Sequence, residues 1–373
     1  MIAPAKKFGI ALLSLVILAG GLFVYYQHNQ KQSPVGQLNT SPSATVTIVD
    51  TIGRSVQVPQ EVKRVACLYA FSGHVATMLD QGRKIVAVPD GLHRDVLLNQ
   101  ICPSIGKAVV PVQSGSINIE ELLKAKPDLV FLQKETALNQ SEVEKLNQFH
   151  IPYLVVDFGS IQEQQKAIKV IGQALGASER AQEYNTFYQN CVDRVEKVVR
   201  EIPPNKRVRV YHSINEATRT DIVGSLPADW MQRTGAVNVA LDQPLRLVEG
   251  KYYASLEQLM VWNPDLILAN EPGVASYITS NPQWASMKAV KDQKVYQMPI
   301  GISRWGHPGG LETPLAMLWT AQLLYPGYCK DIDIEAETQK FYQQFFHVQL
   351  DQESIEQILS GHGMRLKKGQ TNQ

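Results

Sequence analysis

One loop near the carboxyl end of the chain gathers side chains that can bind an anion or a metal. Residues 301–310 include four glycines and a proline, which hold Arg304, Trp305 and His307 on a short segment. Arg304 can neutralise negative charge, Trp305 can stack on a flat group, and His307 can donate a hydrogen bond or ligate a metal. The alternative is a rigid turn whose tryptophan packs against its own lobe. We favour ligand contact, because Arg and aromatic side chains in loops are enriched in binding sites.

Further candidates follow the expected strands, because ligands of open α/β sheets meet the loops at the carboxyl ends of the strands. Tyr252 and Tyr253 offer phenolates for ferric iron or ring faces for a porphyrin, although one of two adjacent tyrosines usually points into the core. His74 suits a packed role and a cleft role equally. The candidate ligand-binding residues are Tyr69, Ser72, Arg94, Arg219, Tyr252, Tyr253, Arg304, Trp305 and His307.

Composition and motif content exclude several chemistries. The 373 residues include 36 Lys plus Arg and 35 Asp plus Glu, so a net charge of +1 leaves no basic surplus for nucleic acid. No hydrolase elbow, phosphate loop, dinucleotide turn or zincin motif is present, so no enzyme and no resident cofactor is indicated. The eight histidines are dispersed, which argues against a bare zinc or manganese site.

The four cysteines are too few and too scattered for a disulfide scaffold. One or two disulfides are compatible with the sequence, and it does not decide which cysteines pair. The cysteines are Cys67, Cys102, Cys191 and Cys329.

Short apolar strands alternate with helical segments, which predicts a parallel or mainly parallel sheet. After a hairpin at 46–49 and 55–58, the expected strands are 64–69, 84–88, 128–132 and 153–157, and then 207–211, 265–269 and 294–298. Thr313 as N-cap and Pro314 at the first helical position should start a helix behind the 301–310 loop. Further helices should begin at 334 and 352. The fold class is therefore α/β, with two Rossmann-like lobes and a ligand cleft between them.

A helical connector should join the lobes, as one long helix or as a broken pair, because apolar residues recur at three and four spacing from 162 to 201. Ala177 and Ser178 interrupt the pattern, and Pro203 and Pro204 stop it. The expected organisation is a membrane anchor or signal segment (1–26), a disordered linker (27–44), an N-terminal lobe (45–160), the connector (161–203), a C-terminal lobe (204–350) and a C-terminal helix and tail (351–373).

The amino terminus predicts an uncleaved membrane anchor. Lys6 and Lys7 precede nineteen residues without charge, 8–26, which as a helix nearly match a ~30 Å hydrocarbon core. The length exceeds that of a usual secretory signal, although cleavage is not decided by the sequence. The basic residues keep the short end inside, so the body should lie on the extracytoplasmic face.

An internal repeat supports the two-lobe reading. Residues 119–132 align with 256–269 without a gap, each as helix, Pro-Asp turn and buried strand. The alignment places Glu120 over Glu257. On spacing alone, these two residues are ordinary acids in the first turn of a helix, where the helix dipole stabilises them.

The order of several segments resembles the substrate-binding proteins of ABC importers for iron-siderophore, haem and cobalamin. The resemblance runs from Val46 to about Phe346, and the segments that carry it are 51–59, 65–68, 122–130, 235–240 and 314–326. It implies two lobes joined by a rigid helical connector, capture of a metal chelate between them, and delivery to a permease and its ATPase in a bacterial or archaeal cell envelope. It also implies that Glu120 and Glu257 dock into arginine pockets of the permease. The anchor and the tail from 352 to 373 depart from the family pattern.

The expected ligand is a ferric siderophore, because aromatic residues beside arginines suit a bulky anionic complex. Haem is the second choice and would take Tyr252, Tyr253 or His307 as an axial ligand. Cobalamin and an oxyanion such as molybdate, held by Arg304 and helix amino termini, stay open. A membrane-tethered enzyme or sensor that reuses the fold is the other class of function. Whether a protein side chain ligates the metal directly is not decided by the sequence.

Overall fold

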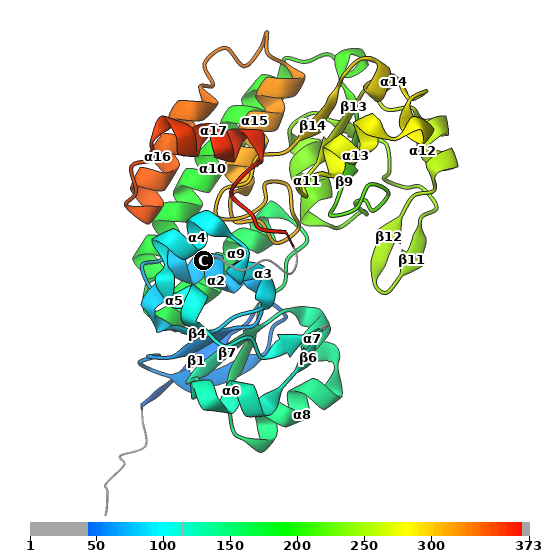
Figure 1. The fold of residues 1–373 in the computed structure, drawn as a ribbon. Helices are drawn as coiled ribbons and strands as arrows, with labels where there is room; N and C mark the ends of the chain where they lie inside the picture. The colour runs from blue at the N-terminus through cyan, green and yellow to red at the C-terminus, as the bar shows by residue number, and fades with distance from the viewer. Residues whose placement is uncertain (1–43, 114, 368–373) are drawn as a thin grey trace, which may run out of the picture. The chain divides into compact units, whose positions relative to one another are not determined.

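Two four-stranded parallel sheets with the same strand order form the framework of the computed structural model, which describes residues 44–113 and 115–367. These residues belong to one compact unit that begins at Ala44. The first sheet has the order β4-β3-β7-β8 and the second has the order β10-β9-β13-β14 (Figure 1). The α/β fold class with two lobes is confirmed.

The N-terminal lobe opens with an antiparallel hairpin in which Val46 faces Val58, as the sequence predicted. Its strands are β1 Thr45–Val49, β2 Ser55–Pro59, β3 Val65–Cys67, β4 Ile85–Ala87, β5 Val112–Gln113, β6 Ser116–Ile117, β7 Leu129–Leu132 and β8 Tyr153–Val155. Its helices are α2 Ala70–Met78, α3 Asp90–His93, α4 Val96–Ile101, α5 Pro103–Lys107, α6 Ile119–Ala125, α7 Lys134–Leu138 and α8 Gln140–Gln148, with a 3-10 turn at Gly82–Lys84.

The C-terminal lobe repeats the alternation and ends in three helices. Its strands are β9 Arg209–Ser213, β10 Val237–Asn238, β11 Arg246–Val248, β12 Lys251–Tyr253, β13 Leu266–Ala269 and β14 Val295–Gln297. Its helices are α11 Leu226–Arg233, α12 Leu256–Trp262, α13 Val274–Ser280, α14 Lys288–Lys291, α15 Thr313–Leu324, α16 Ile334–Phe346 and α17 Gln352–Ser360, with 3-10 turns at Pro204–Lys206 and Pro282–Trp284. All seven predicted sheet strands occur at the predicted places. The β11-β12 hairpin and the short strands β5, β6 and β10 were not expected.

The connector is the broken pair of helices, α9 Ile161–Leu175 and α10 Ser178–Arg200. Gly176 ends α9 in the left-handed conformation, with φ 72°, which glycine adopts without steric cost. The two helices pack closely where a Cβ on Gly172 would lie 2.6 Å from Cβ of Ala181. The connector therefore consists of two helices, α9 and α10, that pack against each other.

The internal repeat is visible in the hydrogen bonds. Asp128 accepts from the backbone N–H of Arg64 at 2.8 Å, and Asp265 accepts from the backbone N–H of Arg209 at 3.1 Å. Each arginine side chain also donates to the last carbonyls of the helix before the strand, α6 or α12. Charged donors at a helix carboxyl end stabilise it, so both repeats close the helix-turn-strand unit in the same way.

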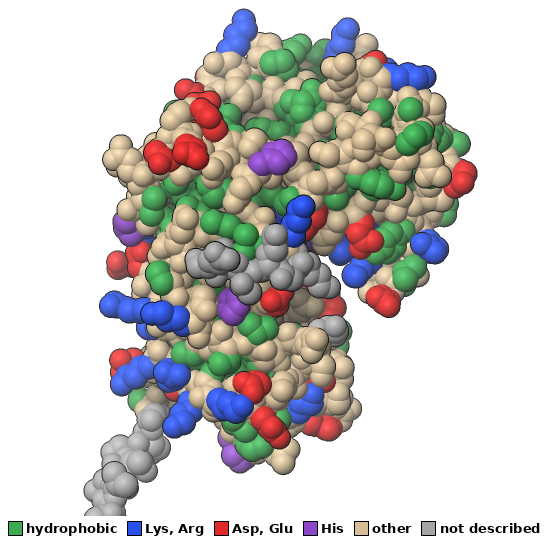
Figure 2. All heavy atoms as spheres, in the orientation of Figure 1, with side chains coloured by type: hydrophobic (Ala, Val, Ile, Leu, Met, Phe, Trp, Pro, Cys, Tyr) green, Lys and Arg blue, Asp and Glu red, His purple; other side chains and the backbone are tan. Residues whose placement is uncertain are grey.

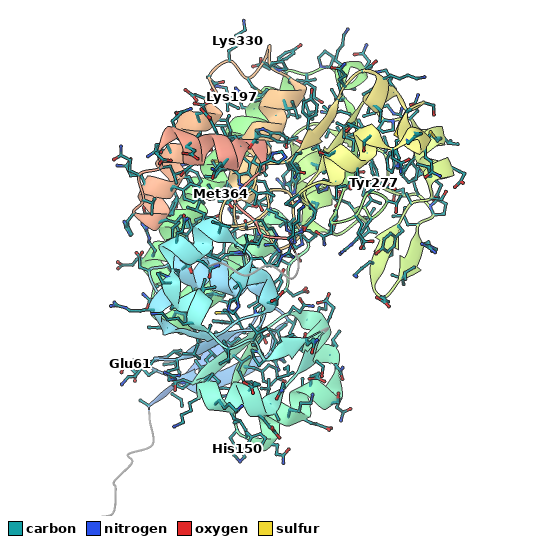
Figure 3. All side chains as sticks on the ribbon, viewed as in Figure 1. Glu61, His150, Lys197, Tyr277, Lys330 and Met364 are labelled. Carbon is teal, nitrogen blue, oxygen red and sulfur yellow. The ribbon has the colours of Figure 1, made fainter. Side chains whose placement is uncertain are left out.

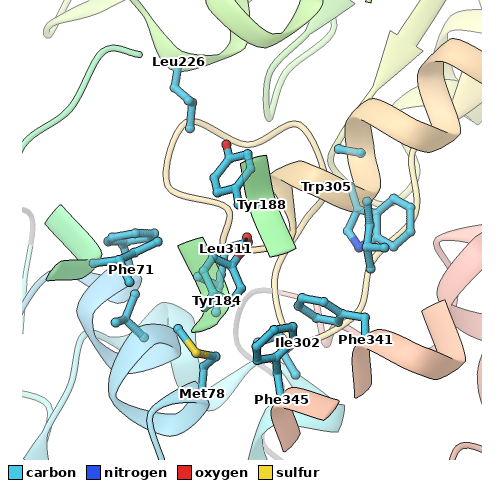
Figure 4. Close-up of a cluster of buried hydrophobic side chains, with 14 of the residues drawn as sticks. Phe71, Met78, Tyr184, Tyr188, Leu226, Ile302, Trp305, Leu311, Phe341 and Phe345 are labelled. Atoms are coloured by element: carbon cyan, nitrogen blue, oxygen red, sulfur yellow. Dashed lines mark hydrogen bonds between the residues drawn. The ribbon is translucent and has the colours of Figure 1, made fainter. Parts of the chain in front are cut away.

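One apolar core runs through both lobes and the connector. It includes Phe71 of the N-terminal lobe, Tyr184 and Tyr188 of α10, and Trp305 and Phe341 beyond the second sheet, all fully buried (Figure 4). Gln164 of α9 accepts from the hydroxyl of Tyr188 at 2.8 Å and donates to the carbonyl of Gly310 at 2.9 Å. The connector thus fixes the loop that precedes α15.

Helix α15 begins differently from the prediction. Its N-cap is Glu312, Thr313 is the first helical residue and Pro314 the second. The Thr313 hydroxyl donates to the carbonyl of Gly310 and not to the helix. The Glu312 carboxylate accepts from Ser303 of the preceding loop, and no side chain caps α15.

Candidate functional site

The buried carboxylate of Glu312 fixes the backbone of the loop 301–310. Glu312 accepts from the backbone N–H of Ser303 at 2.8 Å and from its hydroxyl at 3.0 Å, and the Tyr342 hydroxyl donates to the other carboxylate oxygen. Burial raises the pKa of Glu312 to about 7, against the lowering effect of these hydrogen bonds. The loop is therefore a rigid platform for Arg304 and His307.

Trp305 is a correction to the sequence analysis. Its side chain is 0% exposed and belongs to the main apolar core. A ring with no exposed face cannot stack on a ligand, so the structure supports the alternative of a packed tryptophan. Neighbouring side chains of the loop point in different directions. Trp305 faces the core, while Arg304 contacts polar groups of other loops.

Arg304 lies among the ends of three adjacent parallel strands. Its guanidinium donates to the side-chain oxygen of Asn215, after β9, and to the carboxylate of Glu271, after β13. The side chain is 12% exposed. Burial and the nearby charge of Arg365 lower its pKa to about 10 in spite of Glu271. Arg304 therefore lies at the carboxyl ends of the parallel strands, the position that the sequence predicted for its loop.

Arg94 connects the two lobes through the same carboxylate. It follows α3 in the N-terminal lobe, its side chain is 15% exposed, and it donates to Glu271 of the C-terminal lobe at 3.3 Å. Glu271 thus bridges Arg94 and Arg304. Arg94 was predicted from the sequence, and its pairing with Glu271 was not.

A second ion pair lies beside the first. Asp95 is buried, contacts Nε2 of His74 at 3.4 Å and accepts from the guanidinium of Arg365. Nδ1 of His74 and Nε of Arg365 have no hydrogen-bond partner among the described residues. The sequence did not predict Asp95 or Arg365 as site residues. Asp95 lies in a turn without a recognisable motif, and Arg365 lies beyond Phe346, where the family resemblance ends.

His307 completes the group as a neutral imidazole. Its Nδ1 accepts from the backbone N–H of Gly309 at 3.1 Å. Burial, followed by the positive charges of Arg304, Arg365 and Arg219, lowers its pKa well below the ordinary value. Since Nδ1 is the acceptor, Nε2 carries the proton and is a donor. We call the eight residues that these interactions connect the interlobe charge cluster: His74, Arg94, Asp95, Arg219, Glu271, Arg304, His307 and Arg365.

The cluster is positively charged. Arg94 and Arg304 contact Glu271, Arg365 contacts Asp95, and Arg219 acts on His307 through its charge, so the four arginines of the cluster exceed its two carboxylates by two charges. In low dielectric surroundings such a surplus attracts an anion strongly. The visible surface contrasts with this, because basic and acidic side chains are mixed over it (Figure 2).

The remaining predicted residues lie around the cluster with other partners. The hydroxyl of Tyr69 would be 3.0 Å from a Cβ on Gly309, so Tyr69 borders the 301–310 loop. Ser72 is fully buried, and its hydroxyl donates to the carbonyl of Tyr69 as a local turn. It offers no group to a ligand in this structure.

The tyrosine pair lies on the β11-β12 hairpin. Tyr253 forms a bridge with Arg219 and donates to the carboxylate of Glu216 at 3.0 Å. Desolvation and the bond to Glu216 raise the pKa of Tyr253. Tyr252 is half-buried, and its carbonyl accepts from Thr220. The structure brings Arg219 to the cluster and leaves both phenols outside the contacts that define it.

The described residues also bear on metals, membranes and disulfides. Within 44–113 and 115–367, no group of three or more His, Cys, Asp or Glu is arranged to hold a metal ion. No helix in this part of the chain is long and apolar enough to span a bilayer, and the predicted anchor at 8–26 lies outside it. All four cysteines are free and buried.

Comparison with known proteins identifies the family. The model of the periplasmic binding protein family matches residues 65–300, which is more than half of the chain. The chain belongs to the periplasmic binding protein family. The resemblance to substrate-binding proteins of ABC importers is thereby confirmed.

Individual relatives agree with this assignment. The molybdate-binding protein MolA of Haemophilus influenzae is 27% identical over 343 residues, which cover 84% of this chain and 94% of MolA. The structure of MolA bound to molybdate has a TM-score of 0.73 at 24% identity and covers 82% of this chain and 99% of that one. CeuE of Helicobacter pylori with Ni(II) bound has a TM-score of 0.69 at 23% identity and covers 84% and 99%. The two structures show a common fold. MolA is the molybdate periplasmic binding protein of an ABC transporter.

Proposed function

We propose that this ABC importer substrate-binding protein captures a small dianionic oxyanion of the molybdate type and delivers it to a permease. The observation that carries the proposal is the interlobe charge cluster, in which four arginines from both lobes exceed two carboxylates by two charges. The surplus matches the charge of a tetrahedral metal oxyanion. Guanidinium N–H donors and Nε2–H of His307 are suitable donors for oxyanion oxygens.

The proposal changes the ranking of ligands that the sequence analysis favoured. A ferric siderophore was expected because Trp305 stood beside Arg304, and Trp305 is buried in the core. A phenolate ligand for iron is disfavoured at Tyr253, because the pKa of this phenol is raised. A haem axial ligand at His307 would lie near the positive charges of three arginines, and with Nδ1 accepting from Gly309 its Nε2 carries a proton and has no free lone pair for iron. These facts favour the oxyanion, which the sequence analysis held as an alternative. The 27% identical relative that binds molybdate supports the same choice.

Delivery would use the two repeated glutamates and an extracytoplasmic position. Glu120 and Glu257 are exposed in the first turns of α6 and α12, so each lobe presents one carboxylate at an equivalent place. Paired arginine pockets on a permease would then fix the orientation of the docked protein. We retain residues 8–26 as the segment that holds the protein at the membrane, on the strength of their length and lack of charge.

Isothermal titration calorimetry on the purified full-length protein tests the proposal. Sodium molybdate and sodium tungstate should bind with micromolar or tighter Kd, while a ferric hydroxamate and haemin should give no saturable heat. The Arg304→Gln variant should weaken molybdate binding about tenfold or more, the scale of a charged hydrogen bond. Arg200→Gln, an exposed arginine of α10, is the matched control and should bind as the wild type does. Tight binding of a ferric chelate without binding of molybdate would refute the oxyanion assignment.

A further inference from the structure

The chain after α17 returns to the N-terminal lobe and enters the site. Gly361 and Gly363 have φ values of 70° and 85°, and these left-handed turns reverse the chain after the helix. Met364 is buried in the main core between α17 and α4 (Figure 3). We call residues 361–367 the C-terminal strap; it descends from α17 toward α3 (Figure 1).

Backbone hydrogen bonds fasten the strap to the turn between α3 and α4. The N–H of Val96 donates to the carbonyl of Met364 at 3.0 Å, and the N–H of Leu366 donates to the carbonyl of Arg94 at 2.9 Å. Asp95 and Arg365 are paired as an antiparallel bridge between these bonds. Two backbone bonds that flank a bridge fix the register, so the strap places the Arg365 side chain at one defined position.

Arg365 lies inside the interlobe charge cluster. Its side chain is 7% exposed and donates to the Asp95 carboxylate and, at 3.3 Å, to the carbonyl of Gly91. Its positive charge acts on both Arg304 and His307, whose pKa values it lowers. Its Nε has no partner among the described residues although the side chain is buried. A buried N–H without a partner is costly, and a bound oxyanion would satisfy it.

The strap also orients a second arginine of the cluster. The carbonyl of Leu366 accepts from Nε of Arg94 at 2.9 Å, and the terminal nitrogen of the same side chain donates to Glu271 of the opposite lobe. One residue of the strap is thus placed in the cluster, and the next holds the arginine that connects the lobes. Pre-oriented donors bind an anion more tightly, because less rotamer freedom is lost on binding.

We propose that the C-terminal strap is part of the ligand site and that Arg365 donates directly to the bound oxyanion. This inference rests on the proposed function, and it goes further by assigning a binding residue to a segment that lies beyond the region matched by the family model. The competing explanation is that Arg365 only neutralises the buried Asp95.

Molybdate titration of purified full-length variants tests whether Arg365 contributes to binding. Arg365→Gln should raise the Kd for molybdate about tenfold to a hundredfold, the scale for loss of a charged hydrogen bond. Arg200→Gln makes the same change at an exposed arginine of α10, outside the strap and the cluster, and should leave the Kd unchanged. If the wild type binds molybdate and Arg365→Gln binds equally well, the strap inference is wrong while the proposed function stands. If the wild type binds neither molybdate nor tungstate, the proposed function fails and the strap inference fails with it.

The double variant Asp95→Asn with Arg365→Gln decides between donation and neutralisation. If Arg365 only balances Asp95, removing both charges restores the wild-type Kd; if Arg365 donates to the ligand, the affinity stays low. Restored affinity would therefore overturn the inference. The double variant also covers the case in which Arg365→Gln does not fold, because it leaves no unpaired buried charge.

Discussion

The guanidinium of Arg304 has lost most of its water, and oxygen atoms of Asn215 and Glu271 from two other loops replace it. Its position depends on a second buried group, Glu312, which holds the backbone of the 301–310 loop through Ser303. The raised pKa of Glu312 means that burial outweighs its hydrogen bonds. The proposed binding residue Arg304 and the buried Glu312 are therefore connected through a single loop.

This arrangement predicts a pH-dependent effect of Glu312→Gln on stability. The pKa of Glu312 is about 7 in the folded protein, above the ordinary 4.5, so the unfolded chain releases this proton more readily. Stability of the wild type should fall as pH rises from about 4.5 to 7, and glutamine removes this effect. The unfolding free energy of the variant minus that of the wild type should increase by about 2 kcal/mol between pH 5 and pH 8. Urea unfolding at both pH values measures it, and a difference that is constant or decreases with pH would contradict the assigned pKa.

Among elements, the repeated unit of helix, Pro-Asp turn and strand is the clearest feature. Helices α6 and α12 have seven residues each, and each is followed by a residue in the left-handed conformation, Lys126 or Asn263. The aspartate of the Pro-Asp turn then accepts from a backbone N–H at the start of the adjacent strand, β3 or β9. Side-chain N-caps from Asn118 and Ser255 begin both helices. Equivalent construction gives Glu120 and Glu257 equivalent exposure on the two lobes.

Charge reversal at the repeated glutamates should separate delivery from capture. The double variant Glu120→Lys and Glu257→Lys should abolish uptake of molybdate by cells, because both lobes would repel an arginine pocket, while the Kd for molybdate stays unchanged. The matched control is Glu179→Lys with Glu353→Lys, two exposed acids in the first turns of α10 and α17. Uptake assays and calorimetry on the same variants measure the two effects. A weakened Kd, or equal loss of uptake in the control, would contradict the docking role.

On the scale of the whole molecule, the two sheets share a continuous core with the α9-α10 pair, and Glu271 joins arginines of both lobes. The sequence predicted the strands, the hairpin and the repeat, because short apolar runs bounded by turn residues are local signals. It placed Arg94, Arg219, Arg304 and His307 in loops at the carboxyl ends of parallel strands, where they lie in the interlobe charge cluster; their role in binding stays a prediction.

The rest of the site could not be predicted from the sequence, because it depends on contacts between residues that are far apart in the chain. Trp305 and Arg304 are neighbours, and only the packing of the folded chain decides that Trp305 lies in the apolar core while Arg304 contacts polar groups of other loops. Asp95 and Arg365 lie 270 residues apart and meet only because the strap returns to α4. A long-range pairing of this kind leaves no periodic pattern in the sequence.

The most direct test of the central claim is the position of molybdenum in a crystal of the protein grown with molybdate. Anomalous diffraction at the molybdenum absorption edge locates the metal without reference to the protein atoms. We predict one strong peak within the interlobe charge cluster, between the guanidinium groups of Arg304 and Arg365 and beside His307. A peak only on the outer surface, or no peak in crystals whose cleft holds a ferric chelate, would contradict the account.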